Sequence, residues 1–154
     1  MKGTRSAGLL VFRHTGRGLE VLLGHMGGPF FARRETGAWT VPKGEYDPDE
    51  PAWEAARREF QEELGLPPPD GVAVPLGEVR QSGGKIVTAW AVEADLDPAT
   101  VVPGTFEMEW PPRSGRIQRF PELDRVAWFT PDRAREVIVT AQTAFLDRLA
   151  EHSP

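Results

Sequence analysis

Three glutamates within five residues have a spacing that lets them act together: Glu59, Glu62 and Glu63. At about 100° per residue on a helix, Glu62 and Glu63 fall at about 300° and about 40° relative to Glu59, so the three carboxylates share one face. Like charges in a single turn repel one another, and a divalent cation would neutralise them. Oxygen donors without cysteine suit Mg²⁺ or Mn²⁺ rather than zinc. Such a cation would bridge phosphate oxygens and lower the pKa of a bound water.

The neighbouring face of the same predicted helix is apolar. It carries Trp53, Ala56, Phe60 and Leu64, which fall between about 60° and 140° on the same wheel. This face can pack on a sheet while the acidic stripe faces a cleft. Pro51 suits the first helical position, and Gly65 follows where the helix should end.

These residues belong to a longer pattern over 44–66, which reads G-x5-E-x7-R-E-U-x-E-E-x-G-U, with U a bulky apolar residue. Seven positions match by identity: Gly44, Glu50, Arg58, Glu59, Glu62, Glu63 and Gly65. At about one chance in ten for each, such a match arises roughly once in ten million registers. A solvated acidic helix face would explain Glu62 and Glu63 alone, but not the whole pattern. The pattern resembles the Nudix box, the signature of hydrolases acting on a nucleoside diphosphate linked to another group.

The resemblance implies roles for individual residues. Glu59, Glu62 and Glu63 would hold the metals or the attacking water, and Gly44 would lend its carbonyl. In the family, the arginine at the position of Arg58 orients the catalytic carboxylates. Arg58 lies about 100° from Glu59, which also suits a structural pairing partner better than a substrate contact. A rival of another class is a catalytically inactive Nudix domain that senses a nucleotide, but such domains commonly lose box carboxylates, and all are present here.

A second pattern, Trp39-Thr40-Val41-Pro42-Lys43-Gly44, leads into the box. A lysine just before the metal-binding turn can reach a phosphate oxygen as a point charge. Trp-x-x-Pro-Lys-Gly is similar to the entry in the Nudix branch that cleaves dinucleoside polyphosphates such as diadenosine tetraphosphate. That branch typically has a base-stacking tyrosine beyond the box, whereas the only tyrosine here is Tyr46, inside it. The alternative function is therefore the pyrophosphohydrolysis of nucleoside triphosphates. The motif also has a purely structural explanation, in which Trp39 is a core residue and Lys43 a surface residue.

Many Nudix enzymes recruit a further glutamate from outside the box as a metal ligand or general base. The stretch from Phe106 to Trp110 alternates strictly, so Glu107 and Glu109 point to the same side of a predicted strand. They are the first candidates, and Glu93 is the next. The alternative is a solvated strand face.

Arginines and aromatic residues in loops are candidates for substrate contact. Arg33 and Arg34 precede the box, and Arg113, Arg116 and Arg119 follow the strand at 106–110. Either group could bind a polyphosphate through bidentate contacts, although solvation explains any single arginine. Phe30, Phe31, Trp90 and Trp110 are the candidates for base stacking, each of which is more often a core residue.

Bulk properties agree with a single domain over residues 1–154. The composition, with 40% hydrophobic and 27% charged residues, is that of a globular protein. A net charge of −5 argues against a nucleic-acid binder. No apolar run approaches the roughly 20 residues of a membrane span, and no secretory signal is evident. We therefore expect a cytoplasmic enzyme with a nucleotide or dinucleotide polyphosphate substrate and no membrane partner. The pattern is silent on oligomeric state.

The remaining elements must position this chemistry. Strands are predicted over 6–14, 19–26, 38–41, 72–81, 85–93, 105–110 and 125–129, with a hairpin turn at 82–84. A last helix is predicted from a Thr130 cap through Leu149, because Val137, Ile138, Ala141 and Phe145 recur at helical spacing. Strands between two helices predict an α/β fold with a mixed sheet. The resemblance implies the same α/β/α sandwich.

Overall fold

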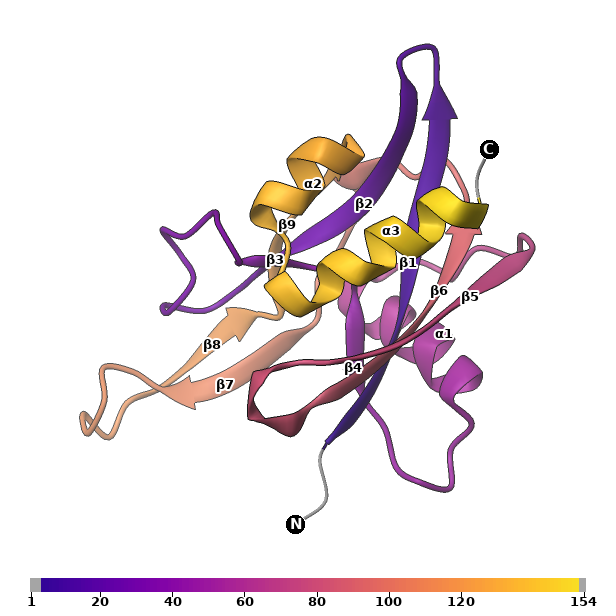
Figure 1. The fold of residues 1–154 in the computed structure, drawn as a ribbon. Helices are drawn as coiled ribbons and strands as arrows, with labels where there is room; N and C mark the ends of the chain where they lie inside the picture. Colours follow the sequence, from indigo (N-terminus) through magenta and orange to yellow (C-terminus); the bar gives the residue numbers. More distant parts are fainter. Residues whose placement is uncertain (1–3, 153–154) are drawn as a thin grey trace.

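The computed structural model of the protein describes residues 4–152 and has a mixed sheet at its centre (Figure 1). Its strands run in the order β3-β2-β1-β6-β5, with β4 also paired to β1 and β9 to β2. The bounds are β1 (Arg5–Thr15), β2 (Gly18–Met26), β3 (Trp39–Thr40), β4 (Lys43–Glu45), β5 (Ala73–Arg80), β6 (Ile86–Glu93) and β9 (Leu123–Phe129). β1 is parallel to β6 and antiparallel to β2 and β4, so the predicted mixed sheet is confirmed.

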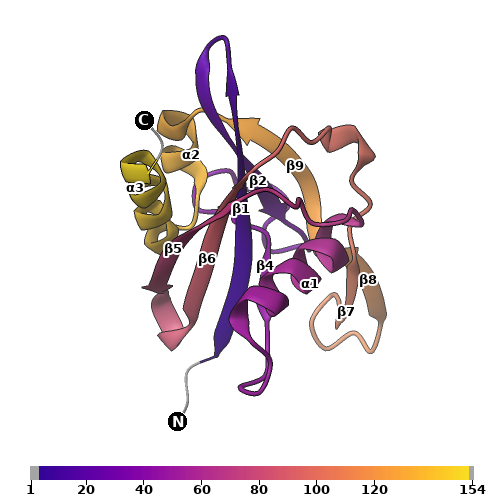
Figure 2. The same cartoon turned by 90° about the vertical axis from the view of Figure 1, so that its right-hand side faces the viewer.

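Helices cover both faces of this sheet, as Figure 2 shows from the side. α1 (Ala52–Leu64) lies on one face, and α2 (Pro131–Val137) and α3 (Thr143–His152) lie on the other. Phe60 and Leu64 of α1 are fully buried in one apolar cluster, and Phe145 and Leu149 of α3 are buried in the second. Each such side chain stabilises the fold by about 1.5–3 kcal/mol. The predicted α/β/α sandwich is therefore confirmed.

Strand β1 supplies side chains to both clusters. Leu10 and Phe12 join the cluster under α2 and α3, whereas Leu9 and Val11 join the cluster under α1. A strand buried on both faces must be apolar throughout rather than alternating. This explains the uninterrupted apolar run at 7–12.

A two-stranded hairpin, β7 (Thr105–Glu109) and β8 (Ile117–Pro121), projects from the main sheet (Figure 1). The sequence predicted β7 but left 111–121 as a loop. Ile117, Gln118 and Arg119 are all exposed, so β8 has no buried face and gives no alternating signal. Short 3₁₀ turns lie at Ser82–Gly84 and Pro98–Thr100.

The prediction of one long C-terminal helix was wrong. Thr130 does cap α2, its Oγ1 accepting from the Arg133 amide at 3.3 Å, but α2 ends at Val137. Val139 is extended (φ −48°, ψ 128°) and its N–H donates to Trp39 O at 2.8 Å. Residues 137–139 are all β-branched and disfavour a helix, and this sheet-like contact offers them another partner. A 3₁₀ turn at Thr140–Gln142 then leads into α3. Within residues 4–152, no helix has the length and apolarity to cross a bilayer.

Candidate active site

A cleft of about 430 Å³ opens between α1, β4 and the turn that joins β8 to β9. Its lining residues are Ser6, Lys43, Gly44, Glu45, Glu59, Glu62, Glu63, Lys85, Gly104, Thr105 and Glu122. The three predicted glutamates of α1 thus share one cavity with Lys43 and Gly44. Two further glutamates line it: Glu45 lies on β4, and Glu122 comes from the opposite side of the cleft.

Gly44 brings β4 against the carboxylate of Glu59. A Cβ atom at Gly44 would lie 1.9 Å from Glu59 Oε2, so no other residue fits there without moving Glu59. Gly44 itself pairs with Ala7 of β1, which fixes β4 to the central strand. The glycine therefore sets how closely the turn before the helix approaches the acidic stripe.

Arg58 holds the exposed side of the acidic stripe. Its Nε and Nη2 donate to Glu50 at 2.8 and 2.9 Å, and its Nη1 donates to Glu59 at 2.8 Å and to Glu62 at 3.2 Å. These hydrogen bonds hold the pKa of Glu50 below its usual range. Arg58 is not part of the cleft lining, and its hydrogen bonds connect three carboxylates of the box.

Glu63 is the most buried carboxylate of the stripe, only 9% exposed. Burial raises its pKa to about 8, and the charges of Glu122 and Glu59 add to the rise while Lys43 opposes it. Burial also raises the pKa of Glu59 and of Glu122, and it lowers the pKa of Lys43. Each charged form is therefore disfavoured until a counter-ion or substrate enters the cleft.

Glu122 is a site residue that the sequence analysis missed. It lies between β8 and β9, where its N–H donates to Gly104 O at 2.8 Å and its carbonyl accepts from the Gly27 amide at 3.0 Å. Its neighbour Leu123 is 2% exposed. In a strand, Glu122 would point to the face opposite the buried Leu123. No strand was predicted over 111–124, so this alternation was not used.

The NUDIX domain model matches residues 2–149. This chain belongs to the Nudix family. The match covers both helical layers and both walls of the cleft, and the family is one of pyrophosphohydrolases. A comparison with curated proteins gave no match.

Solved structures share the Nudix fold over almost the whole chain. An Ap4A hydrolase binary complex from C. elegans has a TM-score of 0.66 at 21% identity and covers 97% of this chain and 96% of its own. The NUDIX domain of Shewanella oneidensis NrtR, complexed with ADP ribose, has a TM-score of 0.65 at 15% identity, with coverages of 100% and 90%. The Nudix hydrolase RenU from M. smegmatis has a TM-score of 0.58 at 26% identity, with coverages of 99% and 85%.

Glu107 and Glu109 do not line the cleft of this Nudix domain. Both are exposed on β7, where Glu107 lies opposite Arg119 in the hairpin and Glu109 accepts from the Gly115 amide at 2.8 Å. Glu93 is exposed at the end of β6. Catalytic roles for these residues stay predictions, and Glu122 is the carboxylate outside the box that the structure brings to the stripe.

The predicted loop contacts also lie outside the cleft. Arg33, Arg34, Arg113 and Arg116 are exposed, and none of them lines it. Phe31 lies near Arg34, with the guanidinium 6.0 Å from its ring centroid. Lys85, which the sequence analysis passed over, does line it, just after the glycine turn at 83–84. Substrate contact by the four arginines and Phe31 stays a prediction.

The Trp-x-x-Pro-Lys-Gly segment divides between core and cleft. Trp39 is 3% exposed and packs edge-on against His25 and Phe129, with its Nε1 donating to Glu35. Lys43, in contrast, lines the cleft. The tryptophan therefore anchors the segment, and the lysine is the member that can meet a ligand.

Nudix hydrolases generally use divalent metals, and the donors in the cleft fit one by type. They are carboxylate oxygens in a partly desolvated cavity, which suits a hard cation. Within residues 4–152, however, no three Asp, Glu or His side chains are gathered closely enough to form a ready-made metal site. Glu62, with a side chain 57% exposed, lines the cleft while it is paired to Arg58.

Proposed function

We propose that the protein is a Mg²⁺- or Mn²⁺-dependent Nudix hydrolase that cleaves a phosphoanhydride bond in dinucleoside polyphosphates. The observation that carries this proposal is one cleft lined by five glutamates together with Lys43 and Lys85; the glutamates are Glu45, Glu59, Glu62, Glu63 and Glu122. Carboxylates suit a cation, and the lysines suit the phosphates that such a cation does not neutralise.

Glu59, Glu62 and Glu63 would hold the cation, which when bound withdraws charge from phosphorus and lowers the pKa of a bound water. Lys43 and Lys85 would bind the phosphate chain. Glu122 is the proposed general base, since it lies across the cleft from the stripe and no hydrogen bond engages its carboxylate among residues 4–152. Water oxygen then bonds to phosphorus, its proton passes to Glu122, and the leaving phosphate keeps the electrons of the broken P–O bond.

The substrate class rests on three features. The entry to the box is similar to that of dinucleoside polyphosphate hydrolases, and the fold is similar to that of an Ap4A hydrolase. A second cavity of about 560 Å³ shares Glu45 with the cleft, and Arg5, Tyr46 and Ile86 line it. A cavity with one aromatic ring and an arginine suits a nucleoside, so a long phosphate chain could run from it into the cleft.

Product analysis in ¹⁸O-labelled water tests the proposal. A panel would contain diadenosine tetraphosphate, the common nucleoside triphosphates, ADP-ribose and a nucleotide sugar, each with Mg²⁺ or Mn²⁺. We expect the highest kcat/KM for the dinucleoside polyphosphate and one ¹⁸O atom in a single product, which marks the attacked phosphorus. Preferential hydrolysis of triphosphates would replace this substrate class by the pyrophosphohydrolase alternative. Nucleotide binding without turnover would favour the inactive sensing domain.

A further inference from the structure

The chain between β6 and β7, residues 94–104, crosses the C-terminal end of α1 on its way to the cleft (Figure 2). We call it the crossover segment. It begins beside β1, where the Ala94 amide donates to Phe12 O at 3.0 Å, and it ends at Gly104, which lines the cleft. Its path therefore connects the β1–β2 hairpin to the active site.

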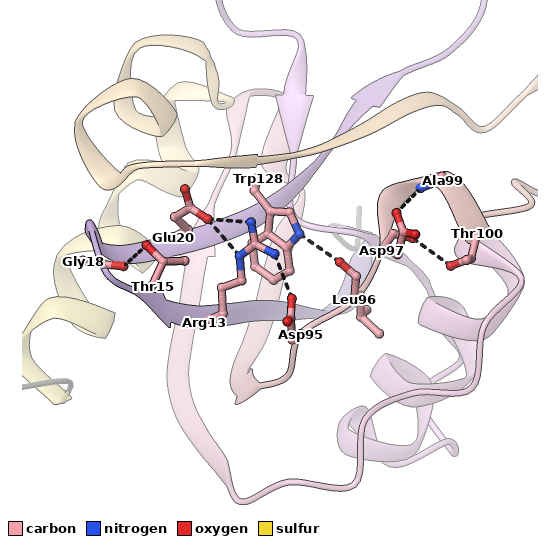
Figure 3. Close-up of polar contacts among 10 residues, drawn as sticks. All are labelled: Arg13, Thr15, Gly18, Glu20, Asp95, Leu96, Asp97, Ala99, Thr100 and Trp128. Atoms are coloured by element: carbon pink, nitrogen blue, oxygen red, sulfur yellow. Dashed lines mark hydrogen bonds and ion pairs between the residues drawn. The ribbon is translucent and has the colours of Figure 1, made fainter.

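The start of the crossover segment is tied to the hairpin by Arg13. Figure 3 shows Arg13 between Glu20 and Asp95, with Trp128 of β9 against it. The guanidinium donates to Glu20 and to Asp95 at 2.8 Å each and lies 4.1 Å from the centroid of the Trp128 ring. Trp128 Nε1 in turn donates to Leu96 O at 2.9 Å. One arginine and one tryptophan thus join β1, β2, β9 and the crossover segment.

The end of the crossover segment touches both walls of the cleft. The Val102 amide donates to Leu64 O at 2.8 Å, which satisfies a carbonyl in the last turn of α1. Gly104 O accepts from the Glu122 amide, also at 2.8 Å. Within three residues, the segment is hydrogen-bonded to the helix of the acidic stripe and to the carboxylate residue opposite.

Gly104 lies where these contacts meet, and it has no room for a side chain. A Cβ atom there would lie 2.7 Å from the carbonyl oxygen of Glu62, a backbone atom that cannot rotate away. A larger residue must push the segment away from α1, and the Glu122 backbone would move with it. The close approach of Gly104 to Glu62 therefore sets the width of the cleft between Glu62 and Glu122.

We propose that the crossover segment is a positioning element for the reaction, with Gly104 as its positioning residue. Through its bonds to Leu64 and Glu122, it holds the acidic stripe and the opposite carboxylate at one separation, while the Arg13–Trp128 cluster keeps its start in place. The proposal rests on the hydrolase function of the cleft but on no particular substrate.

The test compares Gly104→Ala with Gly16→Ala. Gly16, in the β1–β2 turn, makes a matched control because a Cβ atom there meets nothing within 4 Å. On whichever phosphoanhydride the wild type hydrolyses, Gly104→Ala should lower kcat on the order of a hundredfold. KM should change little, because the phosphate-binding lysines do not move. Equal effects in the two variants, or a loss confined to KM, would overturn the proposal.

Amide hydrogen exchange supplies a readout that does not depend on activity. In Gly104→Ala the Glu122 amide should exchange faster, while the amides of β1 keep their protection. Unchanged exchange at Glu122 would also overturn the proposal. If Gly104→Ala does not fold, Trp128→Phe decides, since it retains an aromatic ring at this position but removes the donor to Leu96 O. This variant should lower kcat by a smaller factor and again speed exchange at Glu122. A wild type without any hydrolysis would refute the proposed function, and exchange at Glu122 would still test the coupling.

Discussion

The two walls of the cleft are built in different ways. The α1 wall places Glu59, Glu62 and Glu63 by spacing along one helix, and Arg58 on the same helix pairs with two of them. The opposite wall places Glu122 through hydrogen bonds to Gly104 and Gly27, which are 18 and 95 residues away in the chain. One wall is set by local geometry and the other by tertiary contacts. Chemistry that needs both walls is therefore only as well ordered as the long-range contacts.

Their electrostatics differ as well. Arg58 partly neutralises the exposed end of the stripe, at Glu59 and Glu62. Toward the cleft interior, Glu63 and Glu122 have no arginine partner among residues 4–152, and burial raises the pKa of both. Lys43 is their nearby cation, and burial lowers its own pKa. A metal would therefore act most strongly at the interior pair, where the two walls face each other.

The largest expected effect comes from metal removal, because the cation would neutralise the carboxylates that face each other across the cleft. With excess EDTA, turnover should fall by about a thousandfold or more, since a bound cation supplies several kcal/mol of transition-state stabilisation. Initial rates measured before and after dialysis check this, with Mg²⁺ or Mn²⁺ restoring the rate. Full turnover in chelator would contradict the assignment of the cleft carboxylates to a metal.

Glu122→Gln tests the opposite wall by itself. The substitution keeps the shape and removes the charge, so kcat should fall by about a hundredfold. The alkaline rise of the pH–rate profile should also flatten if Glu122 accepts the proton. Glu107→Gln and Glu109→Gln are matched controls on the exposed strand β7 and should keep near wild-type rates. The opposite ranking would return the role to the strand that the sequence analysis favoured.

The same contrast explains what could be read from the sequence. The stripe and the β5–β6 hairpin depend on neighbours within a few residues, and periodicity or turn residues predicted each of them. Glu122 depends on a carbonyl 18 residues earlier, and the end of α2 depends on a contact between Val139 and Trp39. Lys85 lies just before β6 and reaches the cleft because β6 pairs with β1. Residues placed by such distant partners leave no local pattern.

A third prediction concerns the stability of the metal-free protein. The pKa of Glu63 rises from a usual 4.5 to about 8 on folding, so the folded state holds a proton that the unfolded state has lost. Stability should therefore fall as the pH rises from about 4.5 to about 8, by a few kcal/mol at about 1.4 kcal/mol per unit. Urea unfolding in EDTA across this range measures it.

Glu63→Gln should flatten this pH dependence, because it removes the titrating group and retains the buried volume. The variant should be more stable than the wild type near pH 8 in EDTA and nearly inactive with Mg²⁺. Glu54→Gln, on the exposed side of α1, is the matched control and should retain the wild-type slope. If the free energy of unfolding of Glu63→Gln depends on pH as steeply as that of the wild type, other groups, such as Glu59 or Glu122, cause this dependence.

The smallest expected effect concerns the contribution of Lys43 to the preference for substrates with a long phosphate chain. If Lys43 binds a phosphate of the chain, Lys43→Ala should raise KM about tenfold for diadenosine tetraphosphate, which corresponds to about 1.4 kcal/mol of binding. Short diphosphate-linked substrates, which place fewer charges in the cleft, should show a smaller change. Steady-state kinetics on both substrates, at fixed ionic strength, measure the difference.

Lys85→Ala sharpens this test, because Lys85 reaches the same cleft from the turn before β6 rather than from the box entry. Additive losses in the double variant would mean that the two lysines bind separate phosphates, whereas a double variant no worse than either single one would mean a shared phosphate. An equal rise in KM for every substrate would show that Lys43 serves β4 and its pairing to β1 rather than the phosphate chain. The Trp-x-x-Pro-Lys-Gly entry would then be a structural turn, and the substrate preference would have to come from the cavity beside Tyr46.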